Sequence, residues 1–515
     1  MRKSRFWLAV AIILCLFVFT RAVLNLGLTP FFDWDTYKYL GAADSLWAGQ
    51  GWPPIFTSGK VDGKPMAVIG GLLHIMPGYV GFILLTWMIS GGITITGICV
   101  LQSVLCLIAY SLAAYWVGRT LGRTVGLLVL AVLTLSPTTA FLEHMVMPGG
   151  LATACVMVSM ALAGTASPRD EPPGRYLPGA GLAGLGMAIA ILLRTSSTAY
   201  VPLPALLVLW RPGRWRATAL WLGLYTLTTV LPLVPWALHN HNQHGIFALS
   251  ASTGRNLYFS AAWGNTIDRA AMLRLYGIER PSNPRDTFMI TRRELMSLLA
   301  GGLTMVEADA ELRRRALEAY RGHGLLALLQ QRHLVLFDLF DLGDTIPGRR
   351  SLRGGREWYF SSPHYSSGPR QHIERTLGYV ASKALVEGME RDQTRTRIAE
   401  SFVSRWVTLA TLEGIPLLVG FLVSVAILLL RGREQWPFII GFAAPPLAFL
   451  AMYTFFGAPT YRYQFQLHPF MQVTILLAIC TVFAHARTAQ SRSRPVNEGS
   501  GRVADESRAS SPGPR

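Results

Sequence analysis

The sequence predicts an all-α polytopic membrane protein, with about ten transmembrane helices and a small, mostly helical outer domain. Of the 515 residues, 51% are hydrophobic and only 15% are charged, whereas soluble domains average about 25% charged residues. Apolar stretches close to the ~20 residues needed to cross a bilayer recur from Phe6–Leu28 to Phe465–His485. So many long apolar stretches cannot all be core helices of a soluble protein.

The first apolar stretch follows a basic N-terminus, as the core of a signal peptide would. It runs on to Arg21, Asn25 and Pro30 instead of a small-residue cleavage site, so we expect an uncleaved first helix. The five cysteines lie in or beside apolar stretches without a CxxC pair, which predicts neither a disulfide framework nor a zinc site. The predicted spans lie near 6–28, 93–117, 122–137, 149–166, 177–194, 197–211, 216–238, 406–430, 435–457 and 463–485.

The distribution of basic residues predicts the topology. If the N-terminus is cytoplasmic, every short cytoplasmic connection carries arginine, as the positive-inside rule requires. The net charge of +18 is therefore largely a topology signal, and no nucleic-acid partner is expected, because such a site needs basic residues interleaved with aromatic ones on a soluble face. The cytoplasmic segments are Arg119–Arg123, Arg169–Arg175, Arg211–Arg216, Arg431–Arg433 and the tail from Arg487; the outer segments are 29–92, 138–148, 195–196, 239–405 and 458–462.

The first long outer segment, 29–92, is too long to be a simple connector. An apolar residue every three or four positions predicts a helix lying in the membrane interface with aromatic rings at headgroup level. These residues are Trp34, Tyr37, Leu40, Ala43 and Trp47.

The second long outer segment, 239–405, holds most of the acidic residues and a helical-looking stretch, Met305–Tyr320, whereas Gly343–Arg370 is predicted to be a loop. We expect a small, mostly helical outer domain here. The chain then divides into a transmembrane module (1–238), this outer domain (239–405), three C-terminal spans (406–485) and a cytoplasmic tail (486–515), which has little to bury and should be disordered.

Asp33 and Asp35 directly follow the first span, among aromatic residues. A carboxylate that loses solvation at a membrane surface can act as a general base for an acceptor hydroxyl, and the pair could also help to bind a divalent cation such as Mg²⁺ or Mn²⁺. Equally, both aspartates could cap a helix that starts near Thr36.

Glu143 and His144 lie in an outer connection, on the face predicted for Asp33. They are candidates to assist an acceptor or a metal, or they are simply solvated or paired with each other. His239, His241 and His244 cluster where the seventh span ends, but no fourth metal ligand is evident nearby. The identity of any metal stays open.

Basic residues on the outer face are not explained by the positive-inside rule. An anionic headgroup on that face would need such partners, and Arg binds phosphate with two parallel hydrogen bonds. Snorkelling and salt bridges are the alternative for each residue taken singly. The set comprises Lys60, Lys64, Arg194, Arg255 and Arg462.

The acidic pair belongs to a pattern, D-x-D-x-Y-x(4)-A-x(6)-G, formed by Asp33, Asp35, Tyr37, Ala42 and Gly49. It resembles the first outer loop of GT-C superfamily membrane glycosyltransferases, and within them the protein O-mannosyltransferase and aminoarabinose transferase group, glycosyltransferase family 39. Further short motifs agree in order over roughly 6–260 and 406–485: Gly63-Lys64-Pro65, Pro77-Gly78-Tyr79, Leu101-Gln102-Ser103, Arg194, Pro235-Trp236 with Asn240 and Gly245, and Arg462-Tyr463 with Pro469.

Two positions depart from the family pattern. Its acidic pair is commonly adjacent, whereas Trp34 separates the two aspartates here, so the choice of base stays open. His239 stands where the family has Arg before Asn240, which leaves a phosphate contact there in doubt.

The resemblance implies an inverting hexosyl- or pentosyltransferase of the plasma (inner) membrane, acting on its periplasmic or extracytoplasmic side. A polyprenyl-phosphate sugar would be the donor, with its phosphate near Lys64, Arg194 and Arg462. An aspartate, Asp33 by preference, would deprotonate the hydroxyl of a protein, lipid or polysaccharide acceptor. The sequence specifies neither the sugar nor the acceptor nor the oligomeric state.

Three other functions stay open: a transporter or flippase of lipid-linked sugars, another outer-face polysaccharide polymerase or ligase, and a receptor that binds through 239–405. Transporters usually place ionisable residues near the membrane midplane. Here they crowd the predicted outer boundary, which favours chemistry at that boundary.

Overall fold

A computed structural model of the chain describes residues 3–31, 34–52, 55–61, 64–69, 75–166, 173–210, 215–250, 252–263, 284–339, 381–392, 396–410, 414–456 and 466–493. The predicted features that lie outside the described residues include Asp33, Gly63, Arg462, Tyr463, the loop Gly343–Arg370 and the tail from 494 onward.

The predicted spans are helices. Among the described residues, six helices are long and apolar enough to cross a membrane, and a seventh span results if α5(Arg123–Leu135) and α6(Pro137–His144), bent by 50°, are counted as one. The protein is therefore a multi-pass membrane protein, as predicted. The six helices lie in α1(Lys3–Gly27), α4(Ile95–Leu121), α7(Pro148–Thr165), α8(Pro173–Leu193), the continuous stretch Trp215–His244 that begins with α10(Trp215–Val230), and α23(His468–Ser493).

Several boundaries differ from those predicted. The sixth span is a 3-10 turn η1(Thr195–Tyr200) and a helix α9(Pro202–Trp210) of only 9 residues. The seventh continues from α10 through η2(Leu231–Leu233) into α11(Val234–His244), so the three histidines stand on a helix.

The C-terminal spans differ as well. The eighth divides into α19(Arg397–Ala410) and α20(Gly414–Leu430). The ninth contains η3(Arg433–Gln435) at its start, then α21(Trp436–Phe438), a π-helical turn η4(Ile439–Ala443) and α22(Ala444–Phe456). α23 runs on to Ser493, so 487–493, assigned to a disordered tail, is helical; this stretch contains no Gly or Pro to stop a helix.

The first outer loop begins with α2(Trp34–Trp47), as its apolar spacing predicts. Tyr37, Leu40 and Ala43 are fully buried in one core cluster with residues of α3(Pro77–Ser90) and α4. The antiparallel hairpin β1(Ile55–Val61) and β2(Lys64–Ile69) was not predicted.

The predicted outer domain is helical where it is described. The helices α12(Thr253–Trp263), α14(Pro284–Ala300) and α15(Met305–Leu339) share a core that includes Leu257, Leu295 and Leu312. α15 starts with a reciprocal cap: the Thr304 N–H donates to Glu307 Oε2 at 2.8 Å, and the Glu307 N–H to Thr304 Oγ1 at 3.3 Å. α18(Lys383–Arg391) and α19 follow on the other side of the undescribed stretch.

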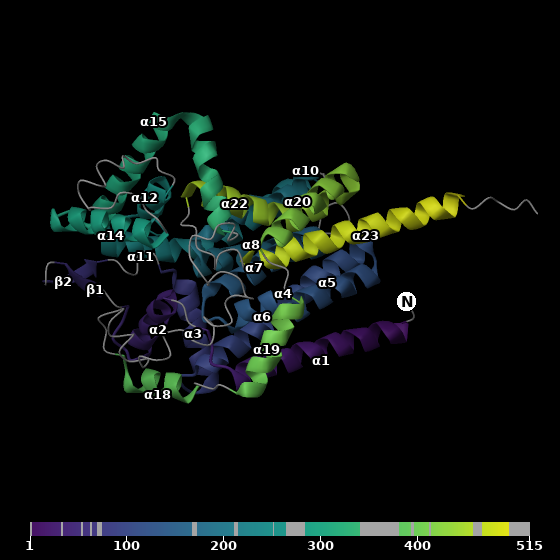
Figure 1. The fold of residues 1–515 in the computed structure, drawn as a ribbon, viewed down its shortest axis with the longest axis horizontal. Helices are drawn as coiled ribbons and strands as arrows, with labels where there is room; N and C mark the ends of the chain where they lie inside the picture. Colours follow the sequence, from purple (N-terminus) through teal and green to yellow (C-terminus); the bar gives the residue numbers. More distant parts are fainter. Residues whose placement is uncertain are drawn as a thin grey trace, which may run out of the picture.

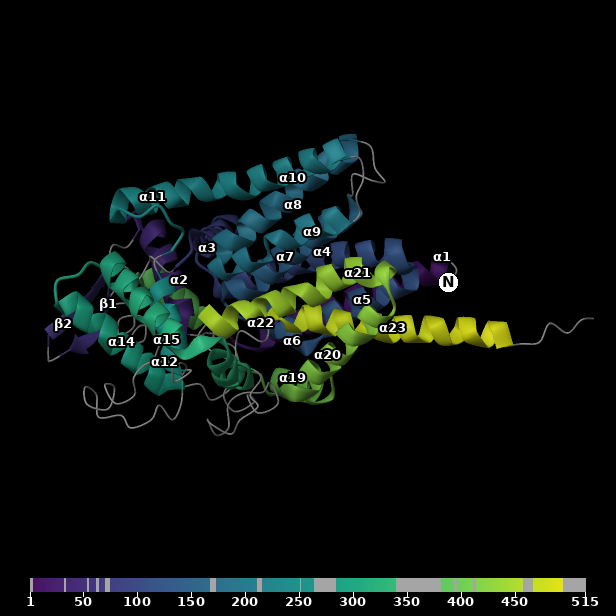
Figure 2. The ribbon, with the colours of Figure 1, turned by 90° about the horizontal axis from the view of Figure 1, so that it is seen from above.

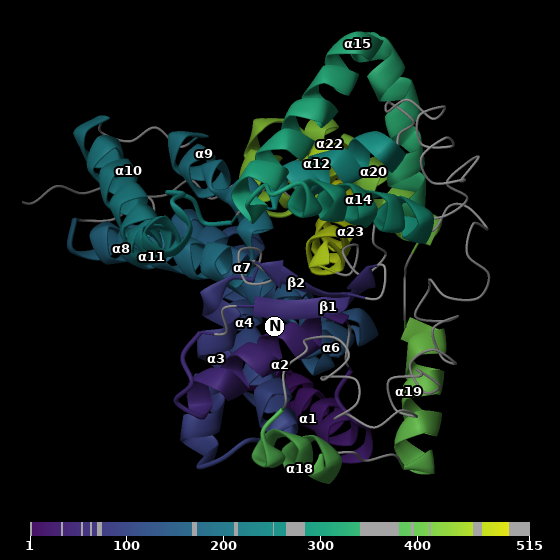
Figure 3. The same cartoon turned by 90° about the vertical axis from the view of Figure 1, so that its left-hand side faces the viewer.

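The connections lie at two opposite ends of the helical bundle (Figures 1 and 2). The N-terminus and the C-terminal end of α23 share one end, where Arg123 lies over the Phe6 ring at 6.0 Å. The opposite end carries α2, the hairpin, α12, α14, α15 and α18 (Figure 3). There, Trp52 of the first loop contacts Trp236 of α11, with ring centroids 5.2 Å apart. The segments predicted as outer thus gather away from the termini; which compartment they face stays a prediction.

Candidate active site

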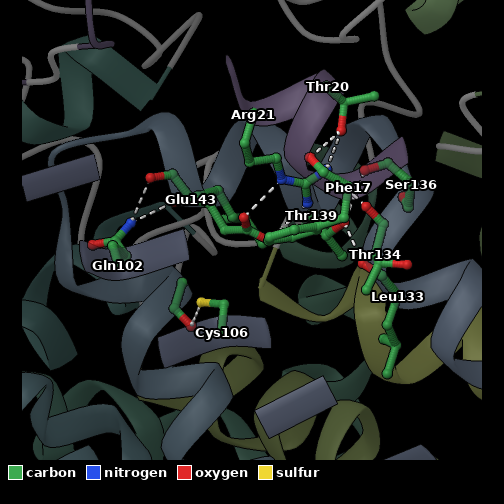
Figure 4. A network of polar contacts seen from close by, with 12 residues as sticks. Phe17, Thr20, Arg21, Gln102, Cys106, Leu133, Thr134, Ser136, Thr139 and Glu143 are labelled. Atoms are coloured by element: carbon green, nitrogen blue, oxygen red, sulfur yellow. Dashed lines mark hydrogen bonds and ion pairs between the residues drawn. The ribbon is translucent and has the colours of Figure 1, made fainter. Parts of the chain in front are cut away.

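The α6–α7 turn, from Glu143 to Met147, carries two of the sequence-predicted residues, Glu143 and His144. α5 ends before Pro137, which has no N–H to donate to the Leu133 carbonyl. The Thr139 hydroxyl donates to that carbonyl instead, at 2.7 Å. The next carbonyl, of Thr134, accepts from Arg21 Nη1 at 2.7 Å. The bend between α5 and α6 therefore has its free carbonyls satisfied by side chains, as Figure 4 shows.

Arg21 of α1 also forms a buried ion pair with Glu143 of α6 (Figure 4). Arg21 Nε donates to Oε2 at 2.9 Å and Nη2 to Oε1 at 2.8 Å, and the two side chains are only 6% and 1% exposed. The guanidinium also lies over the Phe17 ring, 4.4 Å from its centroid. Both carboxylate oxygens are thus held by one planar donor, the arrangement in which Arg–carboxylate pairs are strongest.

His144, the other residue predicted here, is buried against the end of α1. Nδ1 lies 3.0 Å from Asn25 Oδ1 and Nε2 lies 3.2 Å from the Thr29 carbonyl. Glu143 and His144 are therefore neither solvated nor paired with each other, because each has a partner in or just after α1. Their predicted roles toward an acceptor or metal stay predictions.

The Phe31 backbone and the Thr36 side chain, on either side of Asp33, are hydrogen-bonded to this turn. The Phe31 N–H donates to the His144 carbonyl and the Val146 N–H to the Phe31 carbonyl, both at 3.1 Å. The Thr36 hydroxyl donates to the Val146 carbonyl at 3.0 Å. The start of the first outer loop is thereby joined to the connection between α6 and α7, two segments that the sequence predicts on one face.

Asp35 lies in the first turn of α2, where its negative charge complements the helix dipole. Its Oδ1 is 2.8 Å from Lys38 Nζ, and its side chain is 30% exposed. The helix-start alternative for this residue is thus observed, and it leaves the carboxylate within reach of solvent.

Gln102 supports the turn from the side of α4. Its Nε2 lies 2.9, 3.1 and 3.2 Å from the carbonyls of Leu142, Glu143 and Met145, and its Oε1 accepts from the Tyr79 hydroxyl at 3.3 Å. The P-G-Y and L-Q-S motifs therefore include residues that contact the turn directly or through one intermediary.

The three predicted phosphate-binding residues are described to different extents. Arg194 directly follows α8 and starts η1, whereas Lys64 opens β2 with only its backbone described. Arg462 lies outside the described residues. The first residue of α23 contacts the start of α6, since His468 Nδ1 is 3.4 Å from Thr138 Oγ1. α23 therefore starts against the helix that carries Glu143.

No group of three or more His, Cys, Asp or Glu within the described ranges could hold a metal ion. His239 is instead stacked on Trp236, with ring centroids 4.9 Å apart. Trp236 and Asn240 donate to the backbone of 248–249, and Gly245 ends α11 with φ 72°, so this motif shapes a turn. A Mg²⁺ or Mn²⁺ site that includes Asp33 stays a prediction.

Sequence reasoning did not assign Arg21 and Asn25 to this site. The signal was available, since an Arg inside an apolar span marks a functional or structural partner. The sequence does not say which of many acidic residues that partner is, because Arg21 and Glu143 are 122 residues apart.

The fold is similar to that of a solved membrane protein, an oligosaccharyltransferase. The particular match is the apo crystal structure of the Archaeoglobus fulgidus oligosaccharyltransferase, with a TM-score of 0.50 and 9% identity. It covers 96% of this chain and 52% of that one, so this chain spans about half the length of the protein it matches. At this identity the likeness is one of fold alone.

Other solved structures match less well. The structure of ArnT from Cupriavidus metallidurans bound to undecaprenyl phosphate has a TM-score of 0.38 and 13% identity, over 95% of this chain and 81% of that one. No protein-family profile matches the sequence, and no curated protein sequence does.

Proposed function

We propose that this protein transfers a sugar from a polyprenyl-phosphate donor to an acceptor at the end of the bundle opposite its termini, on the extracytoplasmic face. The bonding of Phe31 and Thr36 to the α6–α7 turn carries the proposal. It ties the loop of the D-x-D motif to a buried part of the helical bundle. Preorganised placement of this kind is what a group-transfer site requires.

An aspartate of this motif, Asp33 by preference, acts as the base. It takes the proton of the acceptor hydroxyl, whose oxygen forms a bond to the anomeric carbon while the bond from that carbon to the phosphate oxygen breaks. A single displacement inverts the carbon and leaves the phosphate on the lipid. Lys64, Arg194 and Arg462 stabilise the negative charge that develops on the leaving phosphate.

Asp35 is the alternative base, and its contact with Lys38 allows the two roles to be separated. We expect Asp33→Asn to reduce transfer by at least about a hundredfold, the low end of general-base contributions, with insertion and thermal stability retained. If Asp35 serves α2 only, Asp35→Asn and the matched control Lys38→Met will have equally small effects.

The assay is transfer of radiolabelled sugar from a polyprenyl-phosphate donor by purified protein in vesicles. Full activity of Asp33→Asn together with loss in Asp35→Asn moves the base to Asp35. Full activity in both variants defeats the assignment of a carboxylate base in this motif.

Transport of lipid-linked sugars is the second candidate, favoured by one observation. Arg21 and Glu143 are ionisable and buried inside or beside spans, as in many transporters. Movement of donor across the bilayer without transfer, in the same vesicles, would support the flippase and contradict the transferase.

A further inference from the structure

Contacts between the end of α1, the start of the first loop and the α6–α7 turn follow one another in sequence order. Residue numbers rise along both segments from one contact to the next. The contacts are Arg21 with Glu143, then Asn25 and Thr29 with His144, then Phe31 with His144 and Val146, and finally Thr36 with Val146. We call this series the register ladder. It fixes which residues of the first loop lie opposite which residues of the turn.

We propose that Arg21 and Glu143 are positioning residues that set the register of this ladder and hence the place of the D-x-D motif. This inference rests on the proposed function, because it assigns the pair a task in sugar transfer. Neither side chain is assigned a contact with substrate: both are buried, and both carboxylate oxygens of Glu143 accept from Arg21.

Two contacts in the ladder are specific to their side chains, the ion pair and the contact of His144 with Asn25, and the ion pair has the larger part in setting register because it joins two charges through two hydrogen bonds. Backbone N–H and carbonyl groups are alike from residue to residue. The hydrogen bonds that Phe31 and the Val146 carbonyl make could therefore form equally well with the neighbouring residue if the two segments shifted by one position. A planar guanidinium that binds one carboxylate through two of its nitrogens, here Nε and Nη2, is held in a defined geometry. Breaking it would leave a buried, unpaired charge, which costs far more than a neutral hydrogen bond.

Arg21 also joins three helices at one point. Its Nη1 donates to the Thr134 carbonyl at the end of α5, while its other nitrogens hold Glu143 of α6. The bend at Pro137 therefore cannot slide along α1 without loss of all these bonds. Gln102 holds the turn only through backbone carbonyls, which do not distinguish one residue from the next.

The test replaces both partners by apolar residues, Arg21→Met/Glu143→Leu. A buried ion pair replaced by hydrophobic residues of similar size often leaves stability unchanged or raised, so this variant separates positioning from folding. We expect a Tm near that of the wild type, kcat lowered at least about tenfold through misplacement of the base, and KM for the donor unchanged. Hydrogen exchange will accelerate at the Phe31 and Val146 amides, which donate the two backbone hydrogen bonds between the first loop and the turn.

The matched control is Tyr225→Phe/Thr229→Val, which removes buried polar contacts of α10 with Val201 and Gly184, away from the ladder. It should retain kcat and leave both amides protected. Should the apolar double variant fail to fold, Arg21→Lys keeps the charge but loses the planar fork, and the same two measurements apply.

Unchanged amide protection with unchanged kcat would overturn the inference, as would a fall in kcat while both amides stay protected. Exchange is measured without substrate, so it also separates the two hypotheses. Wild-type protein that transfers no sugar refutes the proposed function, whereas accelerated exchange in the variant still demonstrates control of the ladder by the ion pair.

Discussion

Gly78 shows how closely backbones approach near the candidate site. A Cβ at this position would lie 2.6 Å from the Leu192 carbonyl carbon and 2.7 Å from its oxygen. α3 can therefore pack against the end of α8 only because residue 78 has no side chain. Arg194 follows two residues after this contact, so the approach of α3 bears on the place of a predicted phosphate-binding residue.

We expect Gly78→Ala to separate α3 from α8, lowering stability by about 1 to 3 kcal/mol, the usual cost of overpacking. The KM for the donor should also rise in this variant, because Arg194 would shift with the end of α8. The control is Gly81→Ala in the same helix, where an added Cβ meets nothing within 4 Å. Thermal unfolding and donor titration check both variants, and equal behaviour of the two would contradict the argument.

The single-residue predictions from sequence succeeded where the signal was local. Asp35 stands at a helix start because Asp favours that position, and the spacing of Tyr37 and Leu40 predicted the helix that follows. Its predicted place in the membrane interface was wrong for these two side chains, which are fully buried in the protein core. The partners of Glu143 and His144 could not be predicted, because Arg21 and Asn25 meet them only through tertiary packing.

At the scale of elements, α15 carries a cluster of ion pairs that makes it sensitive to acid. Hydrogen bonds from Arg314 and then Arg315 lower the pKa of Glu311 from 4.5 to about 2. The stabilisation from a carboxylate with a depressed pKa is complete above its unfolded pKa and is lost as the pH falls through its folded pKa. For Glu311 this window runs from about 4.5 down to about 2.

We expect Glu311→Gln to remove this part of the acid sensitivity. The Tm of the wild type should fall as the pH is lowered across that window, and the Tm of the variant should fall less. The difference between the two will be small, because solvent screens exposed ion pairs. Glu387→Gln on α18 is the control, since its pair with Lys383 is 3.4 Å long and exposed. Identical pH dependence of wild type and Glu311→Gln would contradict the assigned ion pairs.

Elements with strong periodicity were predicted, and those set by short signals were not. The long spans and α2 follow from runs of apolar residues. The hairpin β1–β2 was missed although Asp62-Gly63, a frequent two-residue hairpin connection, separates its strands in the sequence. α9 is too short to cross a bilayer by itself. Hydropathy does not show the break between η1 and α9 that precedes Pro202, because the residues immediately on either side are apolar.

At the scale of the whole molecule, Arg123 lies over Phe6 near the N-terminus, and α2, the hairpin, α14 and α18 lie at the opposite end of the bundle (Figure 1), the arrangement that the positive-inside rule predicts for these segments. Single cysteines can test the orientation. Lys383→Cys, on a side chain 91% exposed at the α18 end, should react with a membrane-impermeant maleimide in intact cells. Ser4→Cys at the N-terminal end should react only after permeabilisation; the wild type reports background from native cysteines. Reaction of Ser4→Cys in intact cells would invert the topology.

The start of α4 depends on a residue made much later. The N–H groups of Ile95 and Thr96 donate to Asp392 Oδ2 at 2.6 and 3.0 Å, which satisfies two donors of the first turn of α4 that the Thr94 cap, bound to the Gly97 N–H, leaves open. Since 297 residues separate Ile95 from Asp392, a ribosome working at about 5 to 20 residues per second would reach the cap roughly 15 to 60 seconds after the helix start. During that interval the nascent chain holds its second span in the membrane with an incomplete end. The first turn of α4 can therefore reach its final form only after Asp392 has been synthesised.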